Sequence, residues 1–365
     1  MKITKLMCMA LTAVLLASCG GAKADSQEKY REISAFANIC MTDSVFGEFY
    51  FDDNDATHFF DYTSMNDVFL CSKPNCKHTP NYTHTHTDDV CSAYDLGYKP
   101  CLYGDKLYYM TNEIRIKDNS PAFSICMRCA DIDGTNRKSI AELEGYQNSG
   151  NNDYLVGYKL YFTAANNRTD DEIIEMKNGN IQYREEGIWC YNFPTDTFEL
   201  IYDRYNDGYI TISLVGYWQG KLYFRSSEID EEDYIKSGYY AIDLESKEVT
   251  EAPSGFVAVS DEYLITTEND TLILHKDNDT RIVAEGFEYE QYLSVYVING
   301  KMFSPKRDYC FDTYTGKCRK VNISKSTYVR AYLDGSYILW GFDFEAQKPL
   351  YSKVLEDEFI GDEIS

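Results

Sequence analysis

Gly104-Asp105-Lys106-Leu107-Tyr108-Tyr109 is the stretch that recurs most clearly along this chain. Its nearest copies are Gly157-Tyr158-Lys159-Leu160-Tyr161-Phe162 and Gly220-Lys221-Leu222-Tyr223-Phe224, and weaker copies begin at Asp261, Asn299 and Asp334. Each copy places turn residues before an apolar and aromatic run, which is the pattern of a tight turn that leads into a β-strand. The sequence therefore predicts a protein built from repeated β-units.

A second signature follows each copy and consists of a strand, a polar turn and another strand. It is found at residues 125–140, 189–200, 239–249 and 309–318. An Asp at the end of the first strand and a Gly, Ser or Thr before the second are typical of a β-hairpin. Each repeat therefore contributes several strands.

The spacing of the repeats indicates the architecture. The later copies lie about 40 residues apart, which is the length of one four-stranded propeller blade. Longer spacings near the start imply loop insertions at residues 166–186 and 228–237, and an incomplete first unit lies at residues 47–62. The 33 Tyr and 19 Phe also suit strands. We predict an all-β protein, a β-propeller of about seven four-stranded blades; a β-solenoid or two tandem sandwiches are the alternatives.

The two signatures together resemble the bacterial extracytoplasmic β-propellers, among them the TolB-like and DUF5050-type lipoproteins. The resemblance covers residues 45–357 and rests on short motifs. It implies a propeller fold and a binding or scaffolding role, and it carries no catalytic residue onto this sequence.

The N-terminus has the pattern of an export signal. A basic start precedes uncharged residues 6–18, a run shorter than the roughly 20 residues that span a bilayer. Leu16-Ala17-Ser18-Cys19 resembles a bacterial lipobox, which implies lipid on Cys19 and cleavage just before it; an ordinary secretory signal is the alternative. We expect a signal peptide at 1–18, a lipidated tether at 19–44 and the propeller at 45–365, outside the cytoplasm and lipid-anchored to the cell membrane.

The charge of the chain excludes some partners. The formal net charge is −24, and no basic stripe is present. Such a chain does not suit nucleic acid, and its charge does not favour anionic lipid. Contact with the membrane is therefore expected through lipid on Cys19.

Residues 71–91 form a loop rich in Cys and His. Thiolates and imidazoles suit zinc, and a structural zinc site uses four such ligands. Pro74 can turn two sulfur atoms toward one point. The predicted ligands are Cys71, Cys76, His78 and Cys91, with His84 or His86 as substitutes. A disulfide among the three cysteines is the alternative, since secreted proteins use cysteine in this way.

Two further cysteine pairs have less specific patterns. Cys310 and Cys318 flank a hairpin turn and are expected either to form a disulfide or to be small buried apolar residues. Cys126 and Cys129 match Cys-x-x-Cys, but their flanks are strand-like, and residues three apart on a strand point to opposite faces.

No motif of a hydrolase or metalloprotease is present. The sequence favours a non-enzymatic binding or scaffold module for a glycan, peptide or protein ligand. A carbohydrate-active or peptide-cleaving propeller enzyme is one alternative, and an envelope sensor of metal or redox state is another.

Overall fold

The structure is a computed structural model, and the part of the chain that it describes is residues 47–52, 56–79, 91–94, 96, 100–117, 120–149, 153–166, 186–203, 210–229, 235–253, 255–259, 263–269, 271–276, 279–284, 296–303, 309–322, 327–343 and 348–363. Cys19, the predicted signal peptide and the tether lie outside the described residues. His84, His86 and most of the two predicted insertions also lie outside them.

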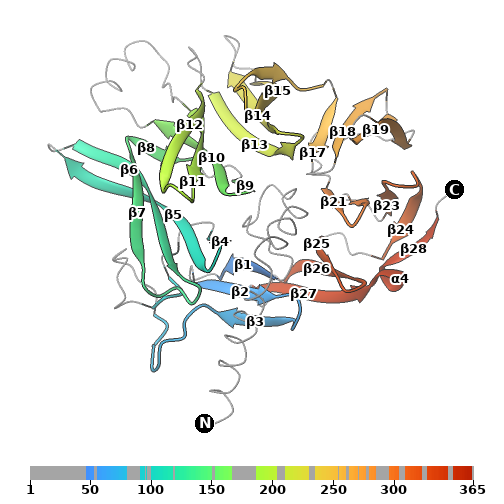
Figure 1. Cartoon of the computed structure of the whole chain (residues 1–365). Coiled ribbons are helices and arrows are strands. Elements are labelled where there is room, and N and C mark those ends of the chain that lie inside the picture. Colours follow the sequence, from blue (N-terminus) through green and yellow to red (C-terminus); the bar gives the residue numbers. More distant parts are fainter. Residues whose placement is uncertain are drawn as a thin grey trace.

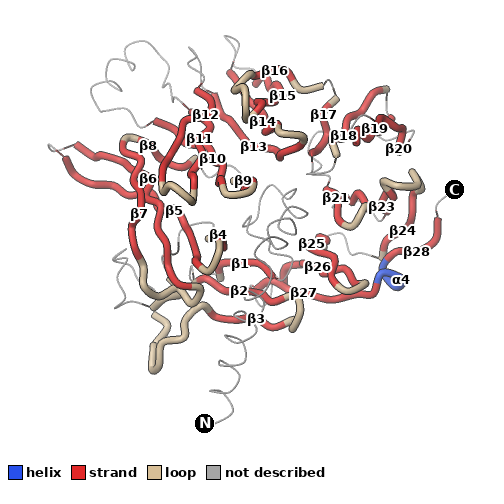
Figure 2. The backbone as a smooth tube through the Cα atoms, viewed as in Figure 1, coloured by secondary structure: helices blue, strands red, loops and turns tan. Residues whose placement is uncertain are grey.

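Seven small antiparallel sheets follow one another around a ring (Figures 1 and 2), which confirms the predicted seven-bladed β-propeller. We number the blades in chain order. Blade 1 contains β1 (Gly47–Phe51), β2 (Thr57–Asp61) and β3 (Asn66–Phe69). Blade 2 contains β4 (Cys101–Tyr103), β5 (Lys106–Lys117), β6 (Ser120–Asp131) and β7 (Lys138–Glu144). Blade 3 contains β8 (Tyr146–Asn148), β9 (Tyr154–Val156), β10 (Lys159–Asn166), β11 (Glu186–Asn192) and β12 (Thr197–Asp203).

Blades 4 to 7 complete the ring. Blade 4 contains β13 (Ile210–Trp218), β14 (Lys221–Ile229), β15 (Ile235–Asp243) and β16 (Val249–Glu251), and blade 5 contains β17 (Phe256–Val259), β18 (Leu264–Glu268), β19 (Thr271–Lys276) and β20 (Asp279–Ala284). Blade 6 contains β21 (Tyr296–Ile298), β22 (Lys301–Phe303), β23 (Tyr309–Asp312), β24 (Cys318–Val321) and β28 (Ile360–Glu363). Blade 7 contains β25 (Tyr328–Leu333), β26 (Ser336–Asp343) and β27 (Lys348–Leu355). One turn of helix, α4 (Glu356–Phe359), joins β27 to β28. No helix in the described part of the chain is long and apolar enough to span a membrane.

The strand count varies from the expected four. Blades 1 and 7 have three strands within the described residues, and blades 3 and 6 have five. The C-terminal strand β28 pairs with β24, so it extends blade 6 rather than the adjacent blade 7.

The first recurring motif forms the tight turn before the second strand of a blade. At Gln219-Gly220, Asn299-Gly300 and Asp334-Gly335 both residues have positive φ, as a type I′ turn requires. This turn matches the twist of the two strands that it joins, so it fixes their register.

The second motif forms a turn closed by an aspartate side chain. Asp243 Oδ1 accepts hydrogen bonds from the backbone N–H groups of Glu245 and Ser246, at 3.0 and 2.9 Å. The same arrangement occurs at Asp61 and Asp312. A short polar side chain that bonds the backbone two residues ahead favours a turn over continued strand, which explains why the Asp recurs.

The hydrophobic core is divided among the seams between blades. Within the described residues, each of seven clusters of buried apolar side chains joins two neighbouring blades. In β14, Leu222 and Phe224 pack toward blade 3, whereas Tyr223 packs toward blade 5. Both faces of a central strand are therefore buried, so the repeats read as continuous apolar and aromatic runs.

The seam between blades 7 and 1 closes the ring. Phe60 of β2 stacks on Tyr351 of β27 with ring centroids 3.7 Å apart. Arg330 of β25 and Glu48 of β1 form an ion pair across this seam, with Nε and Oε2 3.7 Å apart and both side chains 1% exposed. Two strands separated by most of the chain are thus joined by stacking and by a buried charge pair.

Substitution of Gly255 by Ala is expected to destabilise the fold. Gly255 has φ +73°, and a Cβ there would lie 1.9 Å from the backbone oxygen of Thr267. The variant Gly255→Ala should lose roughly 2–4 kcal/mol of unfolding free energy, measured by chemical denaturation.

Gly220→Ala is the matched control, because Gly220 has φ +78° but no atom within 4 Å of the added Cβ. It should lose only the backbone cost of about 1–2 kcal/mol. Equal losses in the two variants would show that the close approach at Gly255 has no energetic effect.

Candidate metal centre

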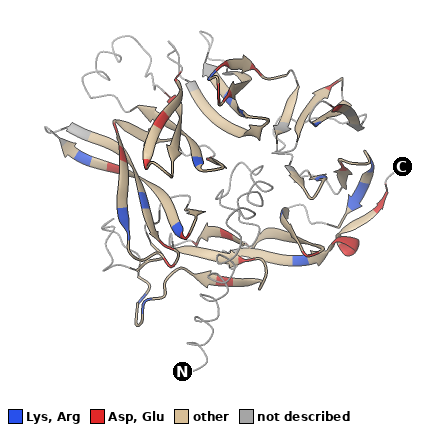
Figure 3. Ribbon diagram, in the orientation of Figure 1, with Lys and Arg blue, Asp and Glu red and all other residues tan. Residues whose placement is uncertain are grey.

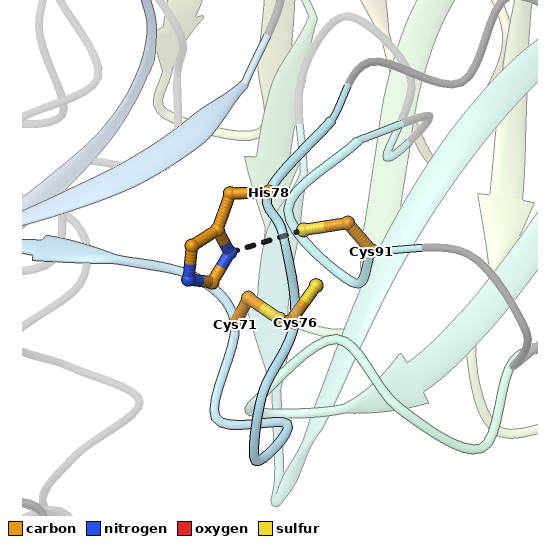
Figure 4. Close-up of side chains that lie close together, drawn as sticks. All are labelled: Cys71, Cys76, His78 and Cys91. Carbon is orange, nitrogen blue, oxygen red and sulfur yellow. Dashed lines mark hydrogen bonds between the residues drawn. The ribbon is translucent and has the colours of Figure 1, made fainter.

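The predicted ligands come together between blades 1 and 2. Cys71, Cys76, His78 and Cys91 each offer one ligand atom, and these four atoms lie within 4.8 Å of one another (Figure 4). Cys91 Sγ lies 3.5 Å from His78 Nδ1. Among the described residues, these are the side chains of metal-ligating type that converge on one point.

The local chain conformation explains how the loop brings two sulfurs together. The Cys76 N–H donates to the Lys73 carbonyl at 3.3 Å, and Asn75 has φ 62°. A turn with Pro second and a left-handed Asn third is a favourable arrangement, because Pro sets its own φ and Asn tolerates the left-handed region. The turn over residues 73–76 thus reverses the chain between Cys71 and Cys76.

Hydrogen bonds tie the two ends of the loop to each other and to blade 1. The Ser92 hydroxyl donates to the Leu70 carbonyl at 3.1 Å, and the Tyr94 hydroxyl donates to the His78 carbonyl at 3.1 Å. The Thr57 N–H donates to the Ala93 carbonyl at 2.6 Å. Residues 91–94 are therefore held beside residues 70–78.

Further contacts join the loop to blade 2. The Ser72 hydroxyl donates to Asp133 Oδ2 at 2.9 Å, and Arg137 Nη2 donates to the Ser92 carbonyl at 2.6 Å. A Cβ at Gly134 would lie 2.6 Å from the Ser92 carbonyl oxygen, so only glycine permits this approach. Sequence reasoning missed these anchoring residues, because nothing local indicates that the turn between β6 and β7 meets this loop.

The surroundings of the sulfurs favour a thiolate at one position. Burial acts to raise the pKa of the Cys71 thiol, but the nearby Ser92 hydroxyl and hydrogen bonds from the Lys73 and Ser92 N–H groups outweigh it. The pKa of Cys71 is therefore lowered. Burial and the neighbouring Cys71 raise the pKa of Cys91 to about 12, against the effect of the Ala93 N–H. Close thiolates repel one another, and a divalent cation between them would offset that repulsion.

The donor set defines the class of metal that would fit. Three sulfurs and one imidazole nitrogen match a four-ligand structural zinc site, whereas Ca²⁺ and Mg²⁺ require oxygen ligands. Cys91 is buried, Cys71 and Cys76 are half-buried, and His78 is exposed. The cluster can therefore hold a metal at the edge of the blade 1–2 core. All three cysteines are free thiols in the structure.

Strand register bears on the expectation for Cys310 and Cys318. Both are free thiols in the structure, which favours the alternative of small packed residues over a disulfide. Cys318 pairs with Phe311, the residue after Cys310, so the two cysteines lie on opposite faces of blade 6. Accordingly, Cys310 packs toward blade 7 and Cys318 toward blade 5.

A second group of polar side chains lies in blade 1, near the Cys/His cluster. His58 Nδ1 lies 3.0 Å from Asp67 Oδ1, and its Nε2 lies 3.6 Å from Asp52 Oδ2. The ring also stacks on Tyr50 and meets the edge of Phe69. Burial acts to lower the pKa of His58, but the hydrogen bonds and charges of Asp67 and Asp52 outweigh it, so the pKa is raised above 6.5.

The raised pKa of His58 predicts a pH-dependent contribution to stability. The stabilisation by protonated His58 is complete below the pKa of about 6.5 that the side chain has in the unfolded chain. It is lost as the pH rises through the higher pKa of the folded state. The difference in unfolding temperature between the wild type and His58→Gln should therefore be largest below about pH 6 and should shrink as the pH rises through the raised folded-state pKa. Asp67→Asn should reduce the pH dependence, and a difference that is constant with pH would contradict the assignment.

Comparison with known proteins gives likenesses of fold alone. No protein-family model matches the chain, and no curated protein matches it. Among solved structures, TolB from Acinetobacter baumannii is 11% identical with a TM-score of 0.33, over 87% of this chain and 65% of that one. An acylaminoacyl peptidase from Pyrococcus horikoshii is 14% identical with a TM-score of 0.40, over 73% and 45%. YjhT is 8% identical with a TM-score of 0.37, over 91% and 94%.

This chain thus spans about two thirds of the TolB chain and less than half of the peptidase chain. None of these neighbours assigns an activity to this chain.

Proposed function

We propose that Cys71, Cys76, His78 and Cys91 bind one structural Zn²⁺ that holds the loop between blades 1 and 2. The observation that carries this proposal is the convergence of four zinc-type ligand atoms within 4.8 Å. The hydrogen bonds around Cys71 add support, because N–H groups directed at sulfur stabilise the thiolate that zinc requires. A structural role is favoured over catalysis because all four tetrahedral positions are taken by protein ligands.

We further propose that the protein is a lipid-anchored extracytoplasmic propeller that acts as a non-enzymatic binding or scaffold module. The lipobox-like Leu16-Ala17-Ser18-Cys19 supports the anchor. The partner would be an envelope or extracellular glycan, peptide or protein. Lys and Arg are scattered among Asp and Glu over the blades (Figure 3), which does not favour a nucleic acid partner.

Metal analysis of the purified mature chain tests the zinc proposal. Inductively coupled plasma mass spectrometry should find one zinc per chain, and Cys91→Ser should remove most of it. Cys318→Ser is the matched control, because Cys318 is also a half-buried thiol but lies in blade 6. A wild-type chain that contains a disulfide among the three cysteines and no metal would overturn the proposal.

Metabolic labelling tests the anchor. A clickable fatty acid should label the wild-type protein in the membrane fraction, and Cys19→Ser should abolish the label. Cys40→Ser should leave the label unchanged, since this cysteine lies downstream of the lipobox-like tetrad. Membrane association without label would count against lipid on Cys19.

A further inference from the structure

We propose that the zinc site is sensitive to oxidants: a peroxide joins Cys71 and Cys76 in a disulfide and expels the metal. This inference rests on the proposed zinc site and assigns it a form of regulation. The structure supports it through the positions of the sulfurs, their accessibility and the isolation of the other cysteines.

Cys71 and Cys76 are the pair placed to form a disulfide. Their sulfurs belong to one cluster within 4.8 Å, and the turn over residues 73–76 already folds one cysteine back toward the other. A bridge between them closes a short segment of one loop, so the sulfurs can meet without displacing a blade. Cys91 approaches from a separate segment that is tied to Thr57 and Arg137 through backbone carbonyls.

Exposure selects the same two residues. Cys71 and Cys76 are half-buried, whereas Cys91 is 6% exposed. His78 is exposed at the open side of the cluster, and Lys77 beside it is exposed too. A small oxidant can therefore reach the first two sulfurs from solvent, and oxidation of cysteine follows accessibility and thiolate character.

The chemistry balances with hydrogen peroxide as the oxidant. One zinc-bound thiolate attacks a peroxide oxygen, the O–O bond breaks, and a sulfenic acid and hydroxide form. The second thiolate attacks the sulfenic sulfur, forms the S–S bond and expels a second hydroxide. The two sulfurs lose two electrons, the peroxide is reduced, and two protons convert the hydroxides to water. Zinc leaves because only one thiolate and one imidazole remain as ligands.

The remaining cysteines do not offer a competing pair within the described residues. Cys101, Cys126, Cys190 and Cys310 are buried. Cys129 and Cys318 are half-buried, but they lie in blades 2 and 6. A disulfide formed under mild oxidation is therefore expected at the zinc site.

Release of the metal would be communicated to blade 2. Ser72 follows Cys71 directly, and its hydroxyl contacts Asp133 in the turn between β6 and β7. Movement of Cys71 toward Cys76 should disturb this contact. Amide hydrogen exchange of residues 131–137 should therefore increase on oxidation.

The experiment begins with the zinc-loaded wild-type chain, whose metal content is measured first. A chain that holds no zinc refutes the proposed zinc site, whereas a zinc-loaded chain allows the oxidation test. Hydrogen peroxide is then added in steps, and released zinc is followed with a colorimetric chelator. The expected result is one zinc released for every two thiols lost, with recovery of binding after reduction by dithiothreitol and addition of zinc.

Peptide mapping identifies the bridge without any variant. Cleavage before aspartate yields residues 67–87, which contain Cys71 and Cys76, and residues 89–94, which contain Cys91. The expected product is peptide 67–87 lighter by two hydrogens. A cross-link between the two peptides, or zinc retained under excess peroxide, would overturn the inference. Cys76→Ser should prevent the mass loss, and Cys318→Ser should leave zinc release unchanged.

Discussion

Replacing Arg330 by Met is expected to lower the free energy of unfolding by about 3–5 kcal/mol, because it leaves a buried carboxylate without its cation. Glu48 and Arg330 face each other across the seam between blades 1 and 7, and both side chains are 1% exposed. The guanidinium also lies over the ring of Trp340, with 5.1 Å to the centroid. Methionine keeps part of the side-chain volume but cannot neutralise Glu48. Urea unfolding followed by tryptophan fluorescence measures the loss.

Two variants separate the charge effect from a packing effect. Arg115→Met removes an arginine whose side chain is 56% exposed and which pairs with Glu142, and it should cost less than about 1 kcal/mol. The double variant Glu48→Leu with Arg330→Met should recover much of the loss, since an apolar pair of similar volume often replaces a buried ion pair without penalty. A cost for Arg330→Met no greater than that for Arg115→Met would contradict the assignment.

Stripping zinc from the site is expected to lower the free energy of unfolding by about 4 kcal/mol relative to protein in free zinc a thousandfold above its dissociation constant. The physical reason is that the proposed zinc would bind the assembled ligand cluster and would bind the unfolded chain much less. Thermal unfolding with and without a zinc chelator measures the change. The loss should be accompanied by faster hydrogen exchange in residues 69–78 and 91–94.

Cys91→Ser is the control for the chelation experiment. Its unfolding temperature should already be low and should not respond to the chelator. Cys318→Ser, which alters a thiol outside the cluster, should respond as the wild type does. An unchanged unfolding temperature after verified removal of zinc would show that the metal does not hold the blade 1–2 loop.

The two predictions concern opposite sides of blade 1. This blade has three strands within the described residues, and a buried ion pair lies on its blade 7 side while the Cys/His cluster lies on its blade 2 side. Its apolar contact with blade 7 is a small cluster centred on Phe60, Tyr62, Ala331 and Ile338. Specific polar or metal interactions on both sides would therefore contribute much to closure of the ring.

The features that the sequence predicted correctly depend on residues close together in the chain. The type I′ turn at Asn299-Gly300 and the aspartate-closed turn at Asp243 are local structures, so the residues that form them recur in several repeats of the sequence. The recurring copies, their spacing and an incomplete first unit were enough to predict about seven blades. The four proposed metal ligands, from Cys71 to Cys91, likewise lie within one loop, and the sequence named them first, with His84 or His86 as substitutes; the structure brings the four together.

Other features depended on the closed ring. The pairing of Glu48 with Arg330, the addition of β28 to blade 6 and the contact of Ser72 with Asp133 join segments far apart in sequence. Cys310 and Cys318 are close in sequence, but strand register turned them to opposite seams. By itself, the sequence determined the repeating strands and their turns, because short-range sterics and hydrogen bonds suffice for these, and it named a candidate ligand set within one loop. Only the tertiary structure decided which distant strands meet, because that depends on how many twisted sheets close the ring and on which face each side chain occupies.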